Sequence, residues 1–305
     1  MAVQNSLLKK QQKTGLTAYL TQDAVKNQIN KVIGGKNGTR FVSSIISAVQ
    51  TTPALQECTN SSILSAALLG ESLNLSPSPQ LGQYYMVPFN NKKKNCTEAQ
   101  FQLGYKGYIQ LAIRSGYYKK LNVLAIKEGE LVSYDPLNEE IEVELIDDDV
   151  IREEAPTIGY YAMFEYENGF RKTLYWSKKK MAAHAEKYSF AFKKNGGLKA
   201  LEDLQAGRIP ERELWKYSSF WFQNFDEMAL KTMLRHIISK WGIMSIDLQN
   251  GLTSDMAVIK DDGTPDYVDT EEATVIDHAE AETVPETGVE VQTAQDPEEE
   301  NQFFK

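Results

Sequence analysis

The sequence predicts an α+β fold, in which a central, mainly antiparallel sheet with an inserted helix is flanked by N- and C-terminal helices. Three observations favour this class. Apolar residues have helical spacing in the first 75 residues, short β-rich runs occupy residues 82–176, and helical spacing returns at residues 225–241. A disordered acidic tail is expected to follow.

Helices are expected in the first quarter of the chain. Residues 1–20 are polar and are predicted to form a loose arm, whereas residues 21–75 are predicted to be helical. Phe41, Ile45 and Val49 lie four residues apart and therefore form one apolar stripe. These helices are interpreted as structural.

Residues 82–250 are predicted to mix sheet and helix. The runs 82–90 and 98–105 read as two strands joined by the cationic turn NKKKNC. Helical spacing over residues 105–116 ends at Gly116, a good residue to follow a helix. This helix is the one expected to be inserted into the sheet.

Further strands are expected after this helix. The predicted runs are 119–127, 130–134, 141–146 and a hairpin over 159–176 that turns at Asn168-Gly169.

Helices are then predicted to close the fold. Ser177 is a natural N-cap for a helix over 177–188, residues 189–197 read as a mobile loop, and residues 225–241 form an amphipathic helix. The single-domain core is expected to end at residue 250, and residues 251–305 are predicted to be a disordered acidic tail.

Charge is distributed unevenly along the chain, whose formal net charge is −9. Residues 251–305 contain 16 acidic residues and two lysines, and residues 128–154 contain 12 acidic residues and one arginine. The rest of the chain has 30 basic and 14 acidic residues. The sequence therefore predicts a basic body with an acidic insert and an acidic tail, which suits a polyanionic partner.

Several protein classes lack support in the sequence. No apolar run approaches the roughly 18 residues of a membrane span, and the N-terminus lacks a secretory h-region. Two cysteines, Cys58 and Cys96, favour a reducing cytoplasm. No nucleotide-binding P-loop, zinc-ligand spacing or GxSxG or HExxH motif occurs. Binding without bond chemistry is therefore expected, with no required cofactor or metal, although magnesium stays open.

One stretch is the leading candidate for contact with a polyanion. Residues 99–127 contain five basic residues and no acid. On the predicted helix, Lys106, Gln110 and Arg114 share one face, which is suitable for a row of phosphates. The alternative is an ordinary solvated helix face.

Other basic residues extend this predicted DNA-binding set. Lys119 and Lys120 follow the predicted helix at 105–116, and Lys178, Lys179 and Lys180 lie in the first turn of the helix at 177–188. Lys193 and Lys194 lie in the predicted loop, and Lys231 and Arg235 lie on the last long helix. Lysines at a helix N-terminus oppose the helix dipole, so a phosphate site is a better explanation for them than stability. Lys231 has an alternative structural partner in Glu227, four residues before it.

Aromatic residues beside these cations are candidates for stacking on bases, which tolerates any base sequence. The candidates are Tyr105, Tyr117, Tyr118, Phe190 and Phe192. Tyr108 is expected in the core. At most one of the two adjacent tyrosines at 117–118 is expected to reach a ligand, because consecutive strand residues point to opposite faces.

Three segments resemble the RecT/Redβ family of phage single-strand annealing proteins, especially its RecT branch. They are GESLNLSPSPQLGQYYMVPF, FQLGYKGYIQLAIRSGYYKKLNVLAIKEGE and FDEMALKTMLRHIISKW, and the similarity runs with gaps over residues 35–250. The resemblance implies a mixed α/β core, a basic DNA groove and ATP-independent pairing of complementary strands. By position, the groove residues would be Lys106 and Arg114, followed by Lys231 and Arg235.

The resemblance also implies a setting. Such proteins coat single-stranded DNA, hold the annealed duplex and assemble as rings or helical filaments in the bacterial cytoplasm, encoded by a phage or prophage. Implied partners are a phage exonuclease and the host single-strand-binding protein. Two alternatives are a passive single-strand coating protein and a metal-dependent nuclease that uses the acids at 139–149.

Overall fold

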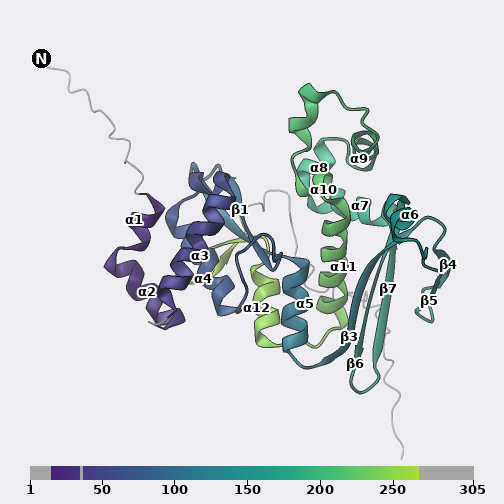
Figure 1. Cartoon of the computed structure of the whole chain (residues 1–305), viewed down its shortest axis with the longest axis horizontal. Helices are drawn as coiled ribbons and strands as arrows, with labels where there is room; N and C mark the ends of the chain where they lie inside the picture. The colour runs from purple at the N-terminus through teal and green to yellow at the C-terminus, as the bar shows by residue number, and fades with distance from the viewer. Residues whose placement is uncertain (1–14, 35–36, 268–305) are drawn as a thin grey trace, which may run out of the picture. The chain divides into compact units, whose positions relative to one another are not determined.

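The computed structural model describes residues 15–34 and 37–267 (Figure 1). Helices precede the first strand: α1 (Leu16–Leu20), α2 (Asp23–Ile33), α3 (Gly38–Thr51), the 3-10 helix η1 (Pro53–Glu57) and α4 (Asn60–Ser72). Most residues of α4 are buried, as is usual for a helix that is apolar on nearly all sides. The predicted loose arm over residues 1–20 is wrong at its end, because Leu20 of α1 is buried in the core; residues 1–14 lie outside the described residues.

The first sheet joins the two ends of the fold. Its antiparallel strands lie in the order β1 (Tyr84–Asn91), β2 (Cys96–Leu103), β8 (Ala257–Ile259) and β9 (Pro265–Asp266). The predicted pairing of the first two strands is confirmed, with Tyr84 opposite Leu103.

The predicted start of the tail at residue 251 is wrong. The helix α12 (Ile246–Ser254) runs across this boundary, and all three residues of β8 are buried beside β2. The short apolar run Ala257–Ile259 is hidden among acids in the sequence, so that composition alone concealed a strand. The acidic residues after 267 lie outside the described residues.

A second antiparallel sheet contains β3 (Tyr118–Lys127), β6 (Thr157–Tyr166) and β7 (Arg171–Ser177), in that order. The Asn168-Gly169 hairpin is confirmed, and Gly169 has the positive φ of +84° that this turn requires. The acidic insert forms a separate ribbon of β4 (Leu131–Asp135) and β5 (Glu140–Val143), followed by α6 (Asp149–Glu154).

Helices after β7 complete the core. They are α7 (Lys178–Tyr188), α8 (Phe190–Lys194), α9 (Gly197–Gln205), the 3-10 helix η2 (Glu211–Tyr217), α10 (Phe220–Gln223) and α11 (Phe225–Trp241). The long α11 lies between α5 (Tyr105–Arg114) and the second sheet (Figure 1), and its Met233, Leu234 and Ile237 are fully buried. The predicted mobile loop at 189–197 is wrong, because α8 and the start of α9 occupy it.

No helix within residues 15–34 and 37–267 is both long enough and apolar enough to cross a membrane.

Candidate nucleic-acid interface

Helix α5 is held close to the first sheet by two glycines. A Cβ atom at Gly104 would collide with the carbonyl oxygen of Gly82, and one at Gly107 would collide with that of Gln83. The backbone N–H of Gly104 also donates to the Gln83 carbonyl at 2.9 Å. Only glycine permits this approach of the helix to the backbone before β1.

The orientation of α5 agrees with the predicted division of its faces. Tyr108, Leu111 and Ala112 are buried in the core, whereas Lys106 and Gln110 are exposed on the opposite side. Lys106 makes no ion pair with any residue that the structure describes. The helix therefore presents an uncompensated ammonium from a rigid support.

Arg114, the third residue of this predicted face, already has backbone partners. Its guanidinium donates to the carbonyl oxygens of Leu73 at 2.6 Å and Asn74 at 3.4 Å, just after the end of α4. Its Nε donates to the Gln110 carbonyl at 3.3 Å. An arginine has five N–H donors, so a phosphate contact here would use the donors that are not bonded to these carbonyl oxygens.

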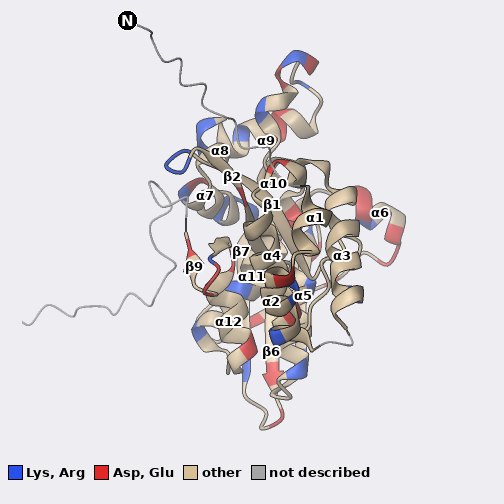
Figure 2. Ribbon diagram, turned by 90° about the vertical axis from the view of Figure 1, so that its left-hand side faces the viewer, with Lys and Arg blue, Asp and Glu red and all other residues tan. Residues whose placement is uncertain are grey.

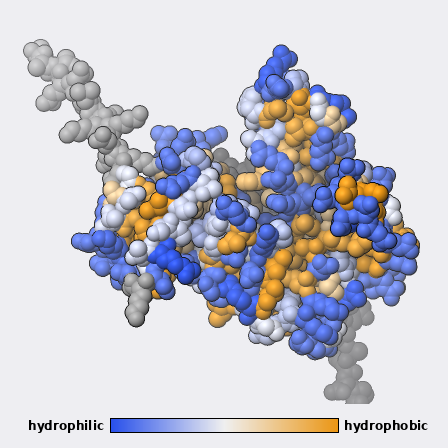
Figure 3. All heavy atoms as spheres, viewed as in Figure 1, coloured by the Kyte–Doolittle hydropathy of each residue, from blue (hydrophilic) through white to orange (hydrophobic). Residues whose placement is uncertain are grey.

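Tyr85 and Lys106 lie close together at the start of α5. The side chains of Tyr85 and Lys106 both lie within 3.5 Å of the place where a Cβ of Gly82 would be. Burial raises the pKa of the Tyr85 hydroxyl, and the negative charge of Glu227 in the first turn of α11 adds to the shift. In the space-filling view, the surface is hollowed between the β1–β2 part and the α8–α10 part (Figure 3).

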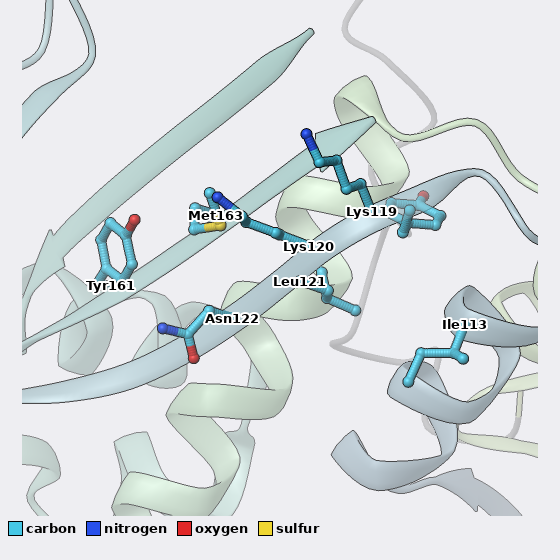
Figure 4. Close-up of a pocket in the computed structure, with 8 residues that line it drawn as sticks. Ile113, Lys119, Lys120, Leu121, Asn122, Tyr161 and Met163 are labelled. Carbon is cyan, nitrogen blue, oxygen red and sulfur yellow. The ribbon is translucent and has the colours of Figure 1, made fainter. Parts of the chain in front are cut away.

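Two further lysines lie on the exposed side of the second sheet. The ammonium of Lys119 is 3.0 Å and that of Lys120 is 3.4 Å from the carboxylate of Glu165. Both side chains stand beside Asn122 and Tyr161 at an open depression (Figure 4). One carboxylate is thus shared by two ammonium groups, and the negative charge of Glu167 also acts on Lys119.

Basic residues also gather on α7 and α8, whereas α6 on the opposite edge of the same view is acidic (Figure 2). Ser177 is confirmed as the N-cap of α7, because its hydroxyl accepts from the Lys180 N–H at 3.2 Å. The Lys180 ammonium lies 4.8 Å from the centroid of the Trp176 ring, which is a cation–π distance. Lys179, Lys193 and Lys194 are exposed, and Lys178 is half-buried.

A model of the RecT family matches residues 39–276. The chain belongs to the RecT family. Membership supports a role in DNA recombination, with DNA binding and single-strand annealing. The match includes α12, β8 and β9, so it extends beyond the limit at residue 250 that the sequence resemblance set.

Two curated relatives are similar over most of their length. Uncharacterized protein YqaK of Bacillus subtilis is 37% identical over 275 residues, which cover 88% of this chain and 82% of the relative. Protein RecT of Escherichia coli is 26% identical over 268 residues, which cover 86% of this chain and 88% of the relative.

Within this RecT fold, two predicted DNA contacts lie beside a buried carboxylate. The Lys231 side chain is 10% exposed and its ammonium lies 3.0 Å from Asp255 Oδ1, while the guanidinium of Arg235 lies 3.6 Å from Oδ2. Burial lowers the pKa of Lys231, and the carboxylate of Asp255 opposes that shift. The prediction of a phosphate contact by Lys231 is therefore corrected, because its ammonium is enclosed beside a buried carboxylate. The Arg235 side chain is 25% exposed and is directed at the same carboxylate, whose single charge does not balance both cations.

Asp255 is the residue that the sequence reasoning missed here. Its carboxylate also accepts from the backbone N–H of Leu103 at 2.9 Å and from the Tyr108 hydroxyl at 3.1 Å. The carboxylate thereby ties α11 to the end of β2 and to α5. Assigning residue 255 to a disordered tail hid this contact, and the signal for it was the apolar run that follows it.

The aromatic candidates divide into exposed and packed residues. Phe192 is buried against Phe222 at a ring distance of 4.7 Å, so its predicted stacking role is wrong. Tyr118 packs edge-on against Tyr166 and donates to the Ile243 carbonyl at 3.0 Å, which assigns it to the fold as well.

The remaining aromatic residues differ in their exposure. Phe190 and Tyr117 stay exposed, Tyr105 is partly buried beside the core, and Tyr108 is in the core as predicted.

Two of the acids that suggested a nuclease have structural partners. Asp148 caps α6 by accepting from the N–H groups of Val150 and Ile151, and Glu139 pairs with Lys172. Over residues 15–34 and 37–267, no three His, Cys, Asp or Glu side chains are grouped so that they would hold a metal ion.

Proposed function

We propose that this chain binds single-stranded DNA through the backbone phosphates, assembles on it as a homo-oligomer and pairs complementary strands without ATP. The observation that supports the proposal best is the exposed face of α5, where Lys106 makes no ion pair with a described residue and the helix is fixed by two glycine contacts. Phosphate contacts position a strand without reading its sequence.

Phosphate binding suits annealing because the base edges have to stay free for the second strand. Pairing itself is favourable, since stacking contributes about 1.4 kcal/mol per base-pair step. The protein then has to align the strands and reduce the repulsion between their phosphates. Lysines and glutamines on a rigid surface meet this need without a nucleotide site.

The residues that we propose for DNA contact are the predicted ones that are at least partly exposed and that are not engaged by Asp255 or by the ring of Tyr166. They are Lys106, Gln110, Arg114, Lys119, Lys120, Lys178, Lys179, Lys180, Lys193 and Lys194, with Tyr105, Tyr117 and Phe190 as aromatic candidates. We also propose a phage exonuclease and the host single-strand-binding protein as partners, to be tested by binding of purified components.

The deciding experiment mixes two complementary oligonucleotides, each coated with a bacterial single-strand-binding protein, in the absence of ATP. We expect the chain to accelerate duplex formation. Tight binding with slowed pairing would instead support a passive coating protein. Shortening of an end-labelled strand in the presence of magnesium would support the nuclease alternative.

A further inference from the structure

Trp215 in η2 is the most exposed of the four tryptophans. Its exposed fraction is 73%, against 37% for Trp241, whereas Trp176 and Trp221 are buried. A ring of this size normally contributes to stability by being buried. Its position in solvent therefore requires another explanation. Trp215 is not among the residues considered for DNA contact above.

The segment that presents Trp215 is firmly held from behind. The Asn195 side-chain amide donates to the carbonyl of Lys216 at 2.8 Å. The next residue, Tyr217, packs edge-on against Phe222 at a ring distance of 4.9 Å, and Phe222 packs against the buried Phe192. The Trp215 ring is thus exposed, while the backbone next to it is anchored to the core.

Cationic groups lie beside the exposed aromatic rings in this part of the molecule. The Lys216 ammonium is 6.0 Å from the centroid of Trp215, and that of Lys194 is 5.6 Å from the centroid of Phe190. The Arg212 side chain is 84% exposed and lies 4.0 Å from Glu213, whose carboxylate is also 3.0 Å from the Lys216 ammonium. Interleaved rings and cations are the arrangement by which proteins bind single strands without sequence preference.

The segment that carries Trp215 is connected through the chain to the helix that packs on α5. The short α10 follows η2 and leads directly into α11, whose Glu227 influences Tyr85 next to Lys106. The segments α8–α10 and β1–β2 lie on either side of the hollow seen in the space-filling view (Figure 3).

We propose that Trp215 is a stacking platform for a nucleobase of single-stranded DNA, an inference that rests on the proposed strand binding. Stacking uses the face of a base and leaves its pairing edge free, as annealing requires. Within η2 the charges of Lys216 and Arg212 are balanced by Glu211 and Glu213, so the cations that favour a polyanion here are the exposed Lys193 and Lys194 of the adjoining α8. The competing partner for the Trp215 ring is a second copy of this chain, and the experiment below distinguishes a nucleobase from that protein contact.

The test follows tryptophan fluorescence of the full-length chain during titration with oligothymidylate and with an abasic strand of equal length. We expect oligothymidylate to quench the emission. The abasic strand keeps its phosphates and should bind with little quenching. Trp215→Phe should abolish most of the quenching and retain affinity, because it keeps a ring, whereas Trp241→Phe should leave the quenching in place.

Affinity supplies the second measurement. Trp215→Ala should weaken binding to oligothymidylate about 5- to 100-fold, the range for loss of one stacked base, and should leave binding of the abasic strand unchanged. Leu214→Ala is the matched control, since it removes exposed apolar area next to the ring without a π face; it should bind as the wild type does.

Two outcomes overturn the inference while leaving the proposed function standing. In the first, the wild type binds and anneals, but Trp215→Ala binds both strands equally well. In the second, Trp215→Ala lowers the oligomer size without DNA and weakens binding of the abasic strand as much as that of oligothymidylate, which assigns the ring to a protein contact. A wild type that binds no strand would refute the proposed function itself.

Discussion

Replacement of Asp255 by Asn tests the buried charge cluster most directly. The substitution keeps the shape of the side chain and an oxygen for the Leu103 N–H, but it removes the negative charge. Lys231 and Arg235 then lose the carboxylate that lies 3.0 and 3.6 Å away. An ammonium stays enclosed without a counter-charge.

The expected cost follows from that burial. Breaking a buried ion pair by removing one partner destabilises a protein by about 3–5 kcal/mol, because an uncompensated charge remains inside. For a chain of this size, each kcal/mol lowers Tm by about 2–4 °C, so a decrease of roughly 6–20 °C is expected. Thermal unfolding followed by circular dichroism at pH 7 measures it.

The pH dependence has a definite sign. Burial lowers the folded-state pKa of Lys231, so between that pKa and the unfolded value of about 10.4 the unfolded chain binds more protons. Stability therefore rises with pH through this window. Without the Asp255 charge the pKa of Lys231 falls further, which widens the window towards neutral pH. The loss of stability that Asp255→Asn causes relative to the wild type should consequently be smaller at pH 10 than at pH 7.

The double variant Asp255→Asn/Lys231→Met supplies the control, because it removes both charges and fills the space with an apolar chain. It should be more stable at pH 7 than Asp255→Asn, and its deficit should not shrink with rising pH. The reasoning is refuted if Asp255→Asn unfolds within about 2 °C of the wild type, or if the double variant is no more stable than the single one.

Three further outcomes are expected. Lys106→Ala should reduce the slope of log K against log salt for single-stranded DNA by about 0.7, while Lys26→Ala on α2 should leave it unchanged; equal slopes in both would contradict a phosphate contact. Gly107→Ala should destabilise the fold by about 1–3 kcal/mol in urea unfolding, because its Cβ meets the Gln83 carbonyl, and an unchanged midpoint would show that α5 relaxes freely. Truncation after residue 250 should lower Tm at least as much as Asp255→Asn, since it removes β8 and Asp255, whereas truncation after residue 267 should cost much less; equal effects would contradict the role of β8.

The sequence predicted the elements whose signals are local. The Asn168-Gly169 hairpin, the Ser177 cap and the buried Tyr108 each depend on a few neighbouring residues, and the structure has all three. Lys106 and Gln110 were expected on an exposed face of their helix because helical period alone determines that face, and they lie there.

The errors concern contacts between distant segments. Helical period places Lys231 on the polar side of α11, but it cannot show that a carboxylate 24 residues later covers that side. Phe192 and Phe190 have the same local context, yet only Phe192 meets the aromatic residues of α10 and α11. Trp215 was missed because exposure of a lone aromatic residue leaves no periodic pattern in a sequence.

The return of β8 to β2 has a consequence for synthesis of the chain. Leu103 and Tyr108 bind a carboxylate that is 152 and 147 residues further along, so their partner leaves the ribosome long after they do. At about 5–20 residues per second, translation of this interval takes roughly 8–30 s. During that time α5 has no anchor on Asp255, and β2 lacks its neighbour β8. We therefore expect the nascent chain to acquire α5 in its final position only near the end of translation.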